Sequence, residues 1–542
     1  MLGTLEILIL KMRDRMDKIV KLFVKRFARV RAWRKGEWAL VFLLLVSLIL
    51  KLTLLSAGHV INPDGVRYID AAQQLAGGNF REAISIEKMP LYPLLIVAFH
   101  YLVRDWALAG QLISLFSLVL AVVPLYWLTK GIFGEKAAFW AGLAFVLSPM
   151  LNGLSIDLIR DPIFLCFVIW AVYFFWRSLT TPRRCFYVLA SVSTIIALFC
   201  RIEGIFLFAI FLPILLVLAI KHKSERNSLF KGMTVLVGLP LLLGLGAGMV
   251  LWGFAGVELT SFSRLGEIRD RLQGILRGDF LAMYHSLYAQ MKSFKNPAAF
   301  WSTGSFAETA RHYLPLIYLL GLAEATFRNL FLLYVVPLRA GFGKRPAFNR
   351  GHWLLLLVAG TYFMVAFYFV FTHDFISKRY VFVPALMLYP WVGRGLERIR
   401  AWIGGIRRPR IALVLFLVVF CGAPAYKTVS EAVGADKGKA FKVAGKWLAS
   451  QTDLQGAVLA CSDPRIRLYS SQELHFLRDG ESFSIFRDLG QMEKVALANK
   501  VDLLVLETSR KKRHLVPELE HYSMVNNIVE NNKEVLIFRR KG

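Results

Sequence analysis

Residues 57 to 93 read AGHVINPDGVRYIDAAQQLAGGNFREAISIEKMPLYP, and this stretch follows the first long apolar run of the chain. It is too polar and too well punctuated by turn residues to be another membrane span. The tetrapeptide Asn62–Gly65 (NPDG) is typical of a tight turn, because proline presets φ and Asp-Gly tolerates the geometry that follows. The residues after it predict a short helix that ends at Gly77. Asp64 is therefore expected on a stiff turn at a membrane surface.

The composition excludes a soluble protein. The 542 residues have a mean hydropathy of +0.52, and 56% of them are hydrophobic. Repeated apolar runs of roughly 18 to 25 residues predict transmembrane helices. The formal net charge of +29 lies mostly in short segments between these runs, which favours cytoplasmic loops near anionic lipids over nucleic acid binding. The five cysteines have no spacing typical of a zinc site or a disulfide framework.

About eleven membrane spans are predicted. They are expected at roughly residues 38–57, 106–130, 137–151, 162–176, 186–200, 205–220, 232–254, 313–336, 353–371, 380–392 and 411–423. The apolar run 91–103 is too short to cross a bilayer and is expected to be re-entrant or to lie on the surface. Lys51, near the outer end of the first span, is expected to extend to the headgroups, or else to face a lipid phosphate.

The chain divides into three parts. Residues 1–37 form a basic amphipathic arm, 38–429 a transmembrane domain with large outer loops 57–105 and 257–312, and 430–542 a small α/β domain. If the N-terminus is cytoplasmic, every strongly basic short loop falls on the inner side. An odd number of spans then places the C-terminal domain outside the cell membrane. The loop 257–312 is interpreted as a mobile cover.

Charged and aromatic groups gather in the segments expected on the outer side. The candidate catalytic residues are Asp64 and Asp161, and the candidate substrate-binding residues are Tyr68, Glu87, Lys88, Asp157, Arg160, Arg201, Glu203, His373, Arg379 and Tyr380. Each has a structural alternative: Asp64 as a turn former or helix cap, Asp161 as a cap before proline, and the remaining charges as local ion pairs or interfacial anchors. Their shared side of the membrane favours a common site.

The chemistry that such a site suggests is attack by a hydroxyl group on a sugar linked to a lipid phosphate. A carboxylate near the reacting centre would act as general base. Cations such as Lys88, Arg201 or Arg379 would stabilise the charge of the departing phosphate.

The order of motifs resembles that of membrane glycosyltransferases of the GT-C fold, in the branch of protein O-mannosyltransferases and bacterial lipid A aminoarabinose transferases. The matching segments are Asp64-Gly65 with Tyr68 and Ala71-Ala72, 87–95 (EKMPLYPLL), Ser148-Pro149, Asp161-Pro162, 201–204 (RIEG), and Arg379-Tyr380 with Pro384. The resemblance covers roughly residues 38–396 and rests on order and topology more than on any single motif.

The resemblance implies a bacterial inner-membrane enzyme with a polyprenyl-phosphate-sugar donor and an inverting reaction. The acceptor would be an envelope lipid such as lipid A, a glycan or a protein. Asp64 matches the catalytic base of the family, and Asp161, less securely Asp157, the aspartate that supports the site. Many relatives have Asp-Glu where this chain has Asp64-Gly65, so a possible divalent cation stays open and no other cofactor is indicated. The alternatives are a transporter or flippase of lipid-linked saccharides, and an envelope assembly scaffold.

Overall fold

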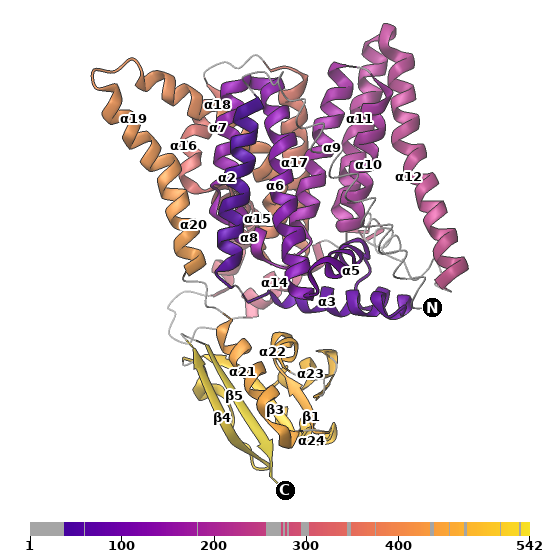
Figure 1. Cartoon of the computed structure of the whole chain (residues 1–542), viewed down its shortest axis with the longest axis vertical. Helices are drawn as coiled ribbons and strands as arrows, with labels where there is room; N and C mark the ends of the chain where they lie inside the picture. The colour runs from indigo at the N-terminus through magenta and orange to yellow at the C-terminus, as the bar shows by residue number, and fades with distance from the viewer. Residues whose placement is uncertain are drawn as a thin grey trace.

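The computed structural model describes residues 37–58, 60–181, 183–255, 273–274, 277–278, 281–293, 303–343, 348–373, 375–433, 438–454, 456–470, 474–477, 479–509, 511–530 and 533–541. A tall bundle of helices forms most of it, and a small domain with a sheet lies below one end of the bundle (Figure 1). The predicted arm 1–37 and most of the loop 257–312 lie outside the described residues, so their predicted roles stay predictions.

The helical part follows the chain as a series of long and short helices. They are α2 (Glu37–Ser56), α3 (Pro63–Ala76), α4 (Phe80–Ile86), α5 (Leu91–Val103), α6 (Trp106–Phe133), α7 (Glu135–Val146), α8 (Pro149–Ile156), α9 (Asp161–Thr180), α10 (Arg184–Cys200), α11 (Ile205–Lys221), α12 (Arg226–Ala255), α14 (Ala282–Ser293), α15 (Thr303–Leu330), α16 (Val335–Phe342), α17 (Arg350–His373), α18 (Phe382–Ile403), α19 (Pro409–Leu417) and α20 (Ala423–Val433). Short 3-10 turns include η2 (Ile202–Gly204) and η7 (Lys378–Val381).

The described residues contain 7 helices that are long and apolar enough to cross a membrane, or up to 10 if each bent pair counts as one span. α10 is a shorter apolar helix beside them. The number agrees roughly with the predicted eleven, and the chain is a multi-pass membrane protein. α4 and α5 are bent by 120° at their junction, which fits the prediction that the run 91–103 does not cross.

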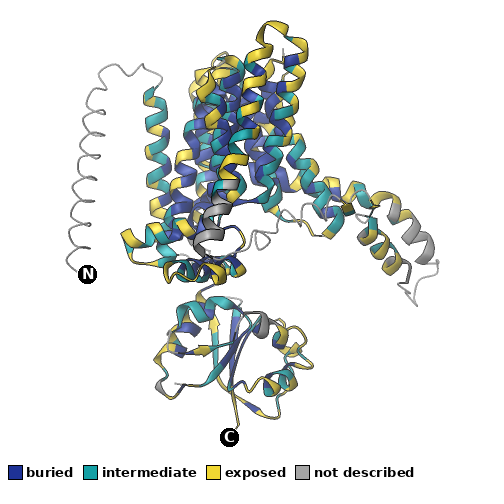
Figure 2. Cartoon of the chain, turned by 90° about the vertical axis from the view of Figure 1, so that its right-hand side faces the viewer, coloured by how far each residue is buried: buried dark blue, intermediate teal, exposed yellow. Residues whose placement is uncertain are grey.

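Two glycines of α18 allow its backbone to approach the backbones of α7 and α16 closely. A Cβ atom on Gly393 of α18 would lie 2.3 Å from the carbonyl oxygen of Ala137 in α7. A Cβ atom on Gly395 would lie 1.6 Å from the carbonyl oxygen of Pro337 in α16. Only glycine allows backbones to approach this closely, so α18 is wedged between α7 and α16. The buried residues fill the centre of the bundle (Figure 2).

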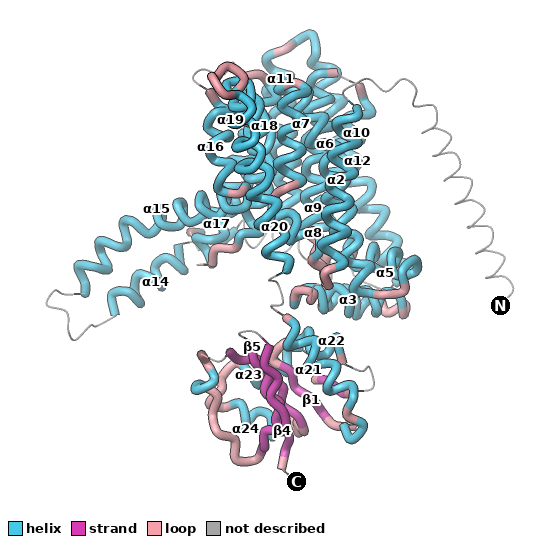
Figure 3. Tube along the Cα trace, turned by 60° about the vertical axis from the view of Figure 1, so that its left-hand side comes forward, coloured by secondary structure: helices cyan, strands magenta, loops and turns pink. Residues whose placement is uncertain are grey.

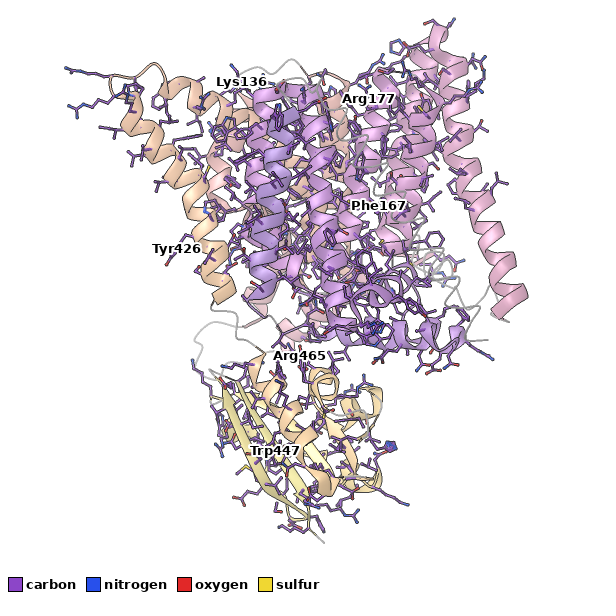
Figure 4. The ribbon with its side chains drawn as sticks, in the orientation of Figure 1. Lys136, Phe167, Arg177, Tyr426, Trp447 and Arg465 are labelled. Carbon is purple, nitrogen blue, oxygen red and sulfur yellow. The ribbon has the colours of Figure 1, made fainter. Side chains whose placement is uncertain are left out.

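The two ends of the bundle differ in what they carry. α3 and α5 lie across the end that faces the small domain, whereas Lys136 and Arg177 lie at the opposite end (Figure 4). This separation fits the predicted division of the loops, with the Asp64 loop and the small domain on one side. α14 and α15 extend sideways from the bundle near that end (Figure 3).

The C-terminal domain is an α/β layer structure, as predicted. Its elements are α21 (Lys439–Ser450), β1 (Val458–Cys461), α22 (Pro464–Tyr469), β2 (His475–Phe476), α23 (Asp479–Phe486), α24 (Met492–Ala498), β3 (Leu503–Ser509), β4 (Tyr522–Glu530) and β5 (Lys533–Arg540). The sheet order is β2-β1-β3-β5-β4. β1 pairs in parallel with β2 and β3, whereas β5 is antiparallel to β3 and β4.

Alternation along the strands explains the three layers. Leu459 and Leu503 pack with Phe441 of α21 on one face, while Ala460 and Leu504 pack with α23 and α24 on the other. Successive side chains of a strand point to opposite faces, so both faces of the central strands are covered.

Lys51 departs from the sequence prediction. Its side chain is fully buried inside the bundle, and its Nζ donates to Asn152 Oδ1 at 2.8 Å. It does not extend to the headgroups, because α2 turns this residue toward α8 rather than toward lipid.

Candidate active site

The segment after α2 presents Asp64 in the first turn of α3. Asn62 caps this helix with its side-chain oxygen, which accepts from the backbone N–H of Gly65 at 2.8 Å, and Pro63 begins it. The cap is therefore Asn62, and the Asp64 carboxylate is available for other partners. Asp64 is 42% exposed.

The loop between α8 and α9 is held in place by contacts with α6. Leu158 is fully buried, and its side chain fills the space beside Gly110 of α6, where a Cβ atom would lie 2.5 Å from Leu158 Cγ. Two polar side chains of α6 satisfy carbonyl groups of the loop: Gln111 donates to Ile156 at 2.9 Å and Ser114 donates to Ile159 at 3.1 Å. This packing fixes the positions of the residues on either side, including Asp157 and Asp161.

The third segment of the site is η7, before α18. Ser377 caps it, and its Oγ accepts from the backbone N–H of Arg379 at 3.4 Å. Asn329 of α15 donates to the carbonyl of Lys378 at 2.7 Å. With α18 wedged in the bundle, these contacts hold the Arg379 backbone in place.

Arg379 joins the two candidate catalytic aspartates. Its Nη1 donates to Asp64 Oδ2 at 2.6 Å and its Nη2 to Asp161 Oδ2 at 2.7 Å. Burial disfavours its charge, but the Asp161 and Asp64 carboxylates more than offset this and raise the pKa of Arg379 above its ordinary value. One planar guanidinium thus orients both carboxylates.

Arg201 completes the arrangement from the other side of Asp161. It contacts Asp161 Oδ1, and its Nη2 donates to Glu203 Oε1 at 2.6 Å. The Glu203 backbone is held in turn by Tyr362 of α17, whose hydroxyl donates to the Glu203 carbonyl at 2.8 Å. Asp161 is 1% exposed, so its two guanidinium partners compensate a buried charge. We call Asp64, Asp161, Glu203, Arg201 and Arg379 the charge network.

A second cluster lies next to the charge network. Glu87 is buried, and its Oε1 accepts from Arg160 Nη1 at 3.0 Å, while Oε2 lies 3.6 Å from Arg67 Nη2. The Arg160 guanidinium lies over the ring of Tyr68, 5.9 Å from its centroid. Arg160 therefore pairs with Glu87 and not with Asp157 at i−3.

Asp157 is half-buried and has no hydrogen bond or ion pair with any described residue. Burial raises the pKa of its carboxyl group from 3.8 to about 6, and the charge on Arg379 opposes part of this shift. Asp157 therefore interacts electrostatically with Arg379 and Asp161 of the charge network but forms no ion pair with them.

The remaining predicted residues are more peripheral. Burial raises the pKa of Tyr380, whose hydroxyl also feels Arg201, Glu203 and Arg379. Its ring lies 4.2 Å from that of Phe369. His373 is exposed, and its ring stacks on the same Phe369 with 4.1 Å between the ring centroids. Lys88 is exposed, next to Glu87 in the chain.

Several groups that shape the site were missed from the sequence. Arg67 and Tyr362 contact the predicted site residues Glu87 and Glu203, which lie 20 or more positions away, and no local motif marks them. Asn329 contacts Lys378, the neighbour of Arg379, from another helix. From the C-terminal domain, Arg465 acts electrostatically on Asp157 (Figure 4).

The geometry gives one exposed carboxylate beside fixed cations, at the end of an apolar bundle. No three His, Cys, Asp or Glu side chains of the described residues form a group that could hold a metal ion. In the charge network, Arg379 lies between Asp64 and Asp161, and Arg201 lies between Asp161 and Glu203. The arrangement suits general base catalysis and the binding of an anionic group.

Comparisons with known proteins agree with this picture. The family profile described as dolichyl-phosphate-mannose-protein mannosyltransferase matches residues 87–252. No curated protein matches the chain. Among solved structures, ArnT from Cupriavidus metallidurans bound to undecaprenyl phosphate has a TM-score of 0.54 at 14% identity, covering 93% of this chain and 98% of that chain.

A second structure is that of the Archaeoglobus fulgidus oligosaccharyltransferase in complex with Zn and sulfate. Its TM-score is 0.53 at 14% identity, and the match covers 86% of this chain and 67% of that chain. Both matches extend over the bundle and beyond it. The chain therefore shares the GT-C fold of these two structures over most of its length.

Proposed function

We propose that this protein transfers a sugar from a polyprenyl-phosphate-linked donor to an acceptor of the cell envelope, on the extracytoplasmic side of the membrane. The observation that carries the proposal is the bridge that Arg379 forms between the exposed carboxylate of Asp64 and the buried carboxylate of Asp161. A base and an anion-binding cation are then fixed together where lipid-linked and water-soluble groups meet.

Asp64 is the proposed general base. Its Oδ1 accepts no hydrogen bond from the described residues, while Oδ2 is held by Arg379. The acceptor hydroxyl gives its proton to Asp64 as its oxygen attacks the anomeric carbon of the donor. The bond from that carbon to the phosphate oxygen breaks, and attack from the opposite face inverts the anomeric centre.

The leaving group is the polyprenyl phosphate, which gains one negative charge when the glycosidic bond breaks. Arg379 and the exposed Lys88 are the proposed partners for this charge. Their attraction is stronger at an apolar boundary than in water. The structure of ArnT bound to undecaprenyl phosphate, a protein of the same fold, supports a lipid phosphate as the ligand.

Asp161, Arg201 and Glu203 are assigned a positioning role. Asp161 is buried and neutralised by two guanidinium groups, so it orients Arg379 rather than taking a proton. We propose no step through a divalent cation, since arginines hold the carboxylates of Asp64, Asp161 and Glu203.

The test is a transfer assay with the purified full-length protein. Polyprenyl-phosphate sugars and envelope fractions from a strain lacking the protein are mixed with it, and products are identified by mass spectrometry. The proposal expects an acceptor heavier by one sugar together with free polyprenyl phosphate. Movement of intact sugar-lipid across vesicles that hold the protein, without free polyprenyl phosphate, would support a flippase instead.

A further inference from the structure

A cleft lies between helix α3 and the C-terminal domain, apart from the charge network. It has a volume of about 620 Å³, within the range of roughly 300 to 1,000 Å³ that ligand sites occupy. Its lining comes from α3, from the start of α6, from α22 and β2, and from Ser470 and Leu474. The lining residues are Val66, Asp70, Gln73, Trp106, Arg467, Leu468, Ser470, Leu474, His475 and Phe476.

The cleft and the charge network use opposite faces of α3. Val66, Asp70 and Gln73 are spaced i, i+4 and i+7, so they share one face. Asp64 precedes Val66 by two positions, which is about 200° around a helix of 3.6 residues per turn. The Asp64 carboxylate accordingly points to Arg379. The cleft is thus a separate site, and the proposed catalytic reaction does not use it.

The C-terminal domain is held to α3 at the wall of this cleft. Arg467 Nη2 lies 2.5 Å from Asp70 Oδ2, and both side chains are partly buried. The Tyr469 hydroxyl accepts from the backbone N–H of Ile61 at 3.3 Å. α22 therefore closes one side of the cleft, and the cleft exists only because the domain docks here.

The chemistry of the lining indicates an uncharged, polyhydroxylated ligand. Asp70 and Arg467 pair with each other, so the wall carries no net charge to attract a phosphate. Gln73, Ser470 and His475 supply donors and acceptors for hydroxyl groups. The Trp106 ring stacks on the His100 ring, with 3.6 Å between the centroids, which fixes its orientation. With Leu468 and Phe476 it offers apolar surface for the C–H groups of a sugar ring.

We propose that this cleft binds a neutral saccharide chain. If the transferase function proposed above holds, that chain is the part of a glycan acceptor that extends away from the reacting end. Asp70 lies six residues after Asp64 on the same helix, about 9 Å along its axis at 1.5 Å per residue. A chain that passes around α3 connects the two sites over a short distance.

The experiment measures binding directly, without any transfer. Linear hexasaccharides of mannose, glucose and N-acetylglucosamine are titrated into the full-length protein in detergent, and binding is followed by saturation-transfer NMR. At least one of them is expected to bind. Gln73→Ala with His475→Ala should weaken that binding about tenfold, because two hydrogen-bonding side chains are lost.

Gln74→Ala is the matched control, since Gln74 is next to Gln73 on α3 but does not line the cleft. Gln73→Trp, which places a large ring in the cleft, should also weaken binding, and unchanged thermal unfolding of each variant verifies folding. Failure of all three saccharides to bind, or equal binding by the cleft variants and the unaltered protein, overturns the proposal. Asp64→Asn should bind the saccharide normally, so loss of transfer alone bears on the catalytic proposal and not on the cleft.

Discussion

Arg379 Nη1 lies 2.6 Å from Asp64 Oδ2, across 315 positions of sequence. This contact connects the start of α3 to the turn that precedes α18. Through the other nitrogen of the same guanidinium it also fixes Asp161. Three segments of the bundle therefore meet at one planar group, and the proposed chemistry depends on that group.

Arg379→Lys should lower the catalytic efficiency about tenfold or more, because an ammonium is a point charge and cannot bridge two carboxylates in one plane. Arg379→Met should lower it further. The transfer assay measures both. Lys378→Ala is the control, since Lys378 lies beside Arg379 in η7 and forms no ion pair among the described residues. A Lys variant as active as the unaltered protein would show that the bridge is dispensable.

Arg201→Gln should destabilise the folded protein by about 3 kcal/mol, because it leaves the buried Asp161 with one partner fewer. Arg328→Gln is the matched control. Its pair with Glu324 is more than half exposed on both sides and should contribute within about 0.5 kcal/mol. Thermal unfolding of the full chain in detergent measures the difference. An equal loss of stability in the two variants would contradict the claim that Arg201 compensates a buried charge on Asp161.

Asp157 gives a pH-dependent prediction. Burial raises the pKa of its carboxyl group to about 6 from 3.8, so the folded state holds this proton more tightly than the unfolded state. The stability from this proton is fully present below pH 3.8 and is lost as the pH rises through about 6. Asp157→Asn removes the cost of the buried charge and should be more stable than the unaltered protein above that range, by about 2 kcal/mol.

The two proteins should converge toward pH 4, where Asp157 is neutral in the folded state. The comparison of midpoints of thermal unfolding across this range is the measurement. A constant difference at every pH would show that packing, and not charge, sets the effect of the substitution.

The orientation of the chain predicts which cysteines react with an impermeant thiol reagent on intact cells or spheroplasts. Ser286→Cys, in α14 near the end that faces the C-terminal domain, should react from outside. The native Cys185 is exposed at the start of α10, beside the basic Arg184, and should react only after the membrane is opened. The reverse pattern would place the charge network on the cytoplasmic side.

Much of the fold follows from local pattern. Apolar length predicts the spans, and the less apolar sequence after the last span predicts a small α/β domain. The site segments were also predictable, because Asp161, Arg201 and Arg379 each stand at a boundary between a polar segment and an apolar run. Asp64 lies in the polar segment that follows the first apolar run. Common placement at one end of a bundle brings such residues together.

The pairing within the site could not be predicted, since it depends on helix rotation. Lys51 shows this: its sequence position allows it to extend to the headgroups, but the rotation of α2 buries it against Asn152. Arg160 likewise bonds Glu87, 73 positions away, rather than a carboxylate on its own turn. The ion pair between Arg467 and Asp70 depends on how the C-terminal domain docks on α3. No pattern in the sequence predicts this docking.

The most direct test of the account is the envelope composition of a strain that lacks the protein and carries Asp64→Asn in its place. Asp105→Asn is the control, because Asp105 is an exposed aspartate that caps α6 and asparagine caps equally well. Mass spectrometry should find the glycosylated product with the unaltered protein and with Asp105→Asn. With Asp64→Asn the product should fall by a factor of about 100 or more at equal amounts of inserted protein. Undiminished product with Asp64→Asn would contradict the central claim that this carboxylate takes the proton of the acceptor.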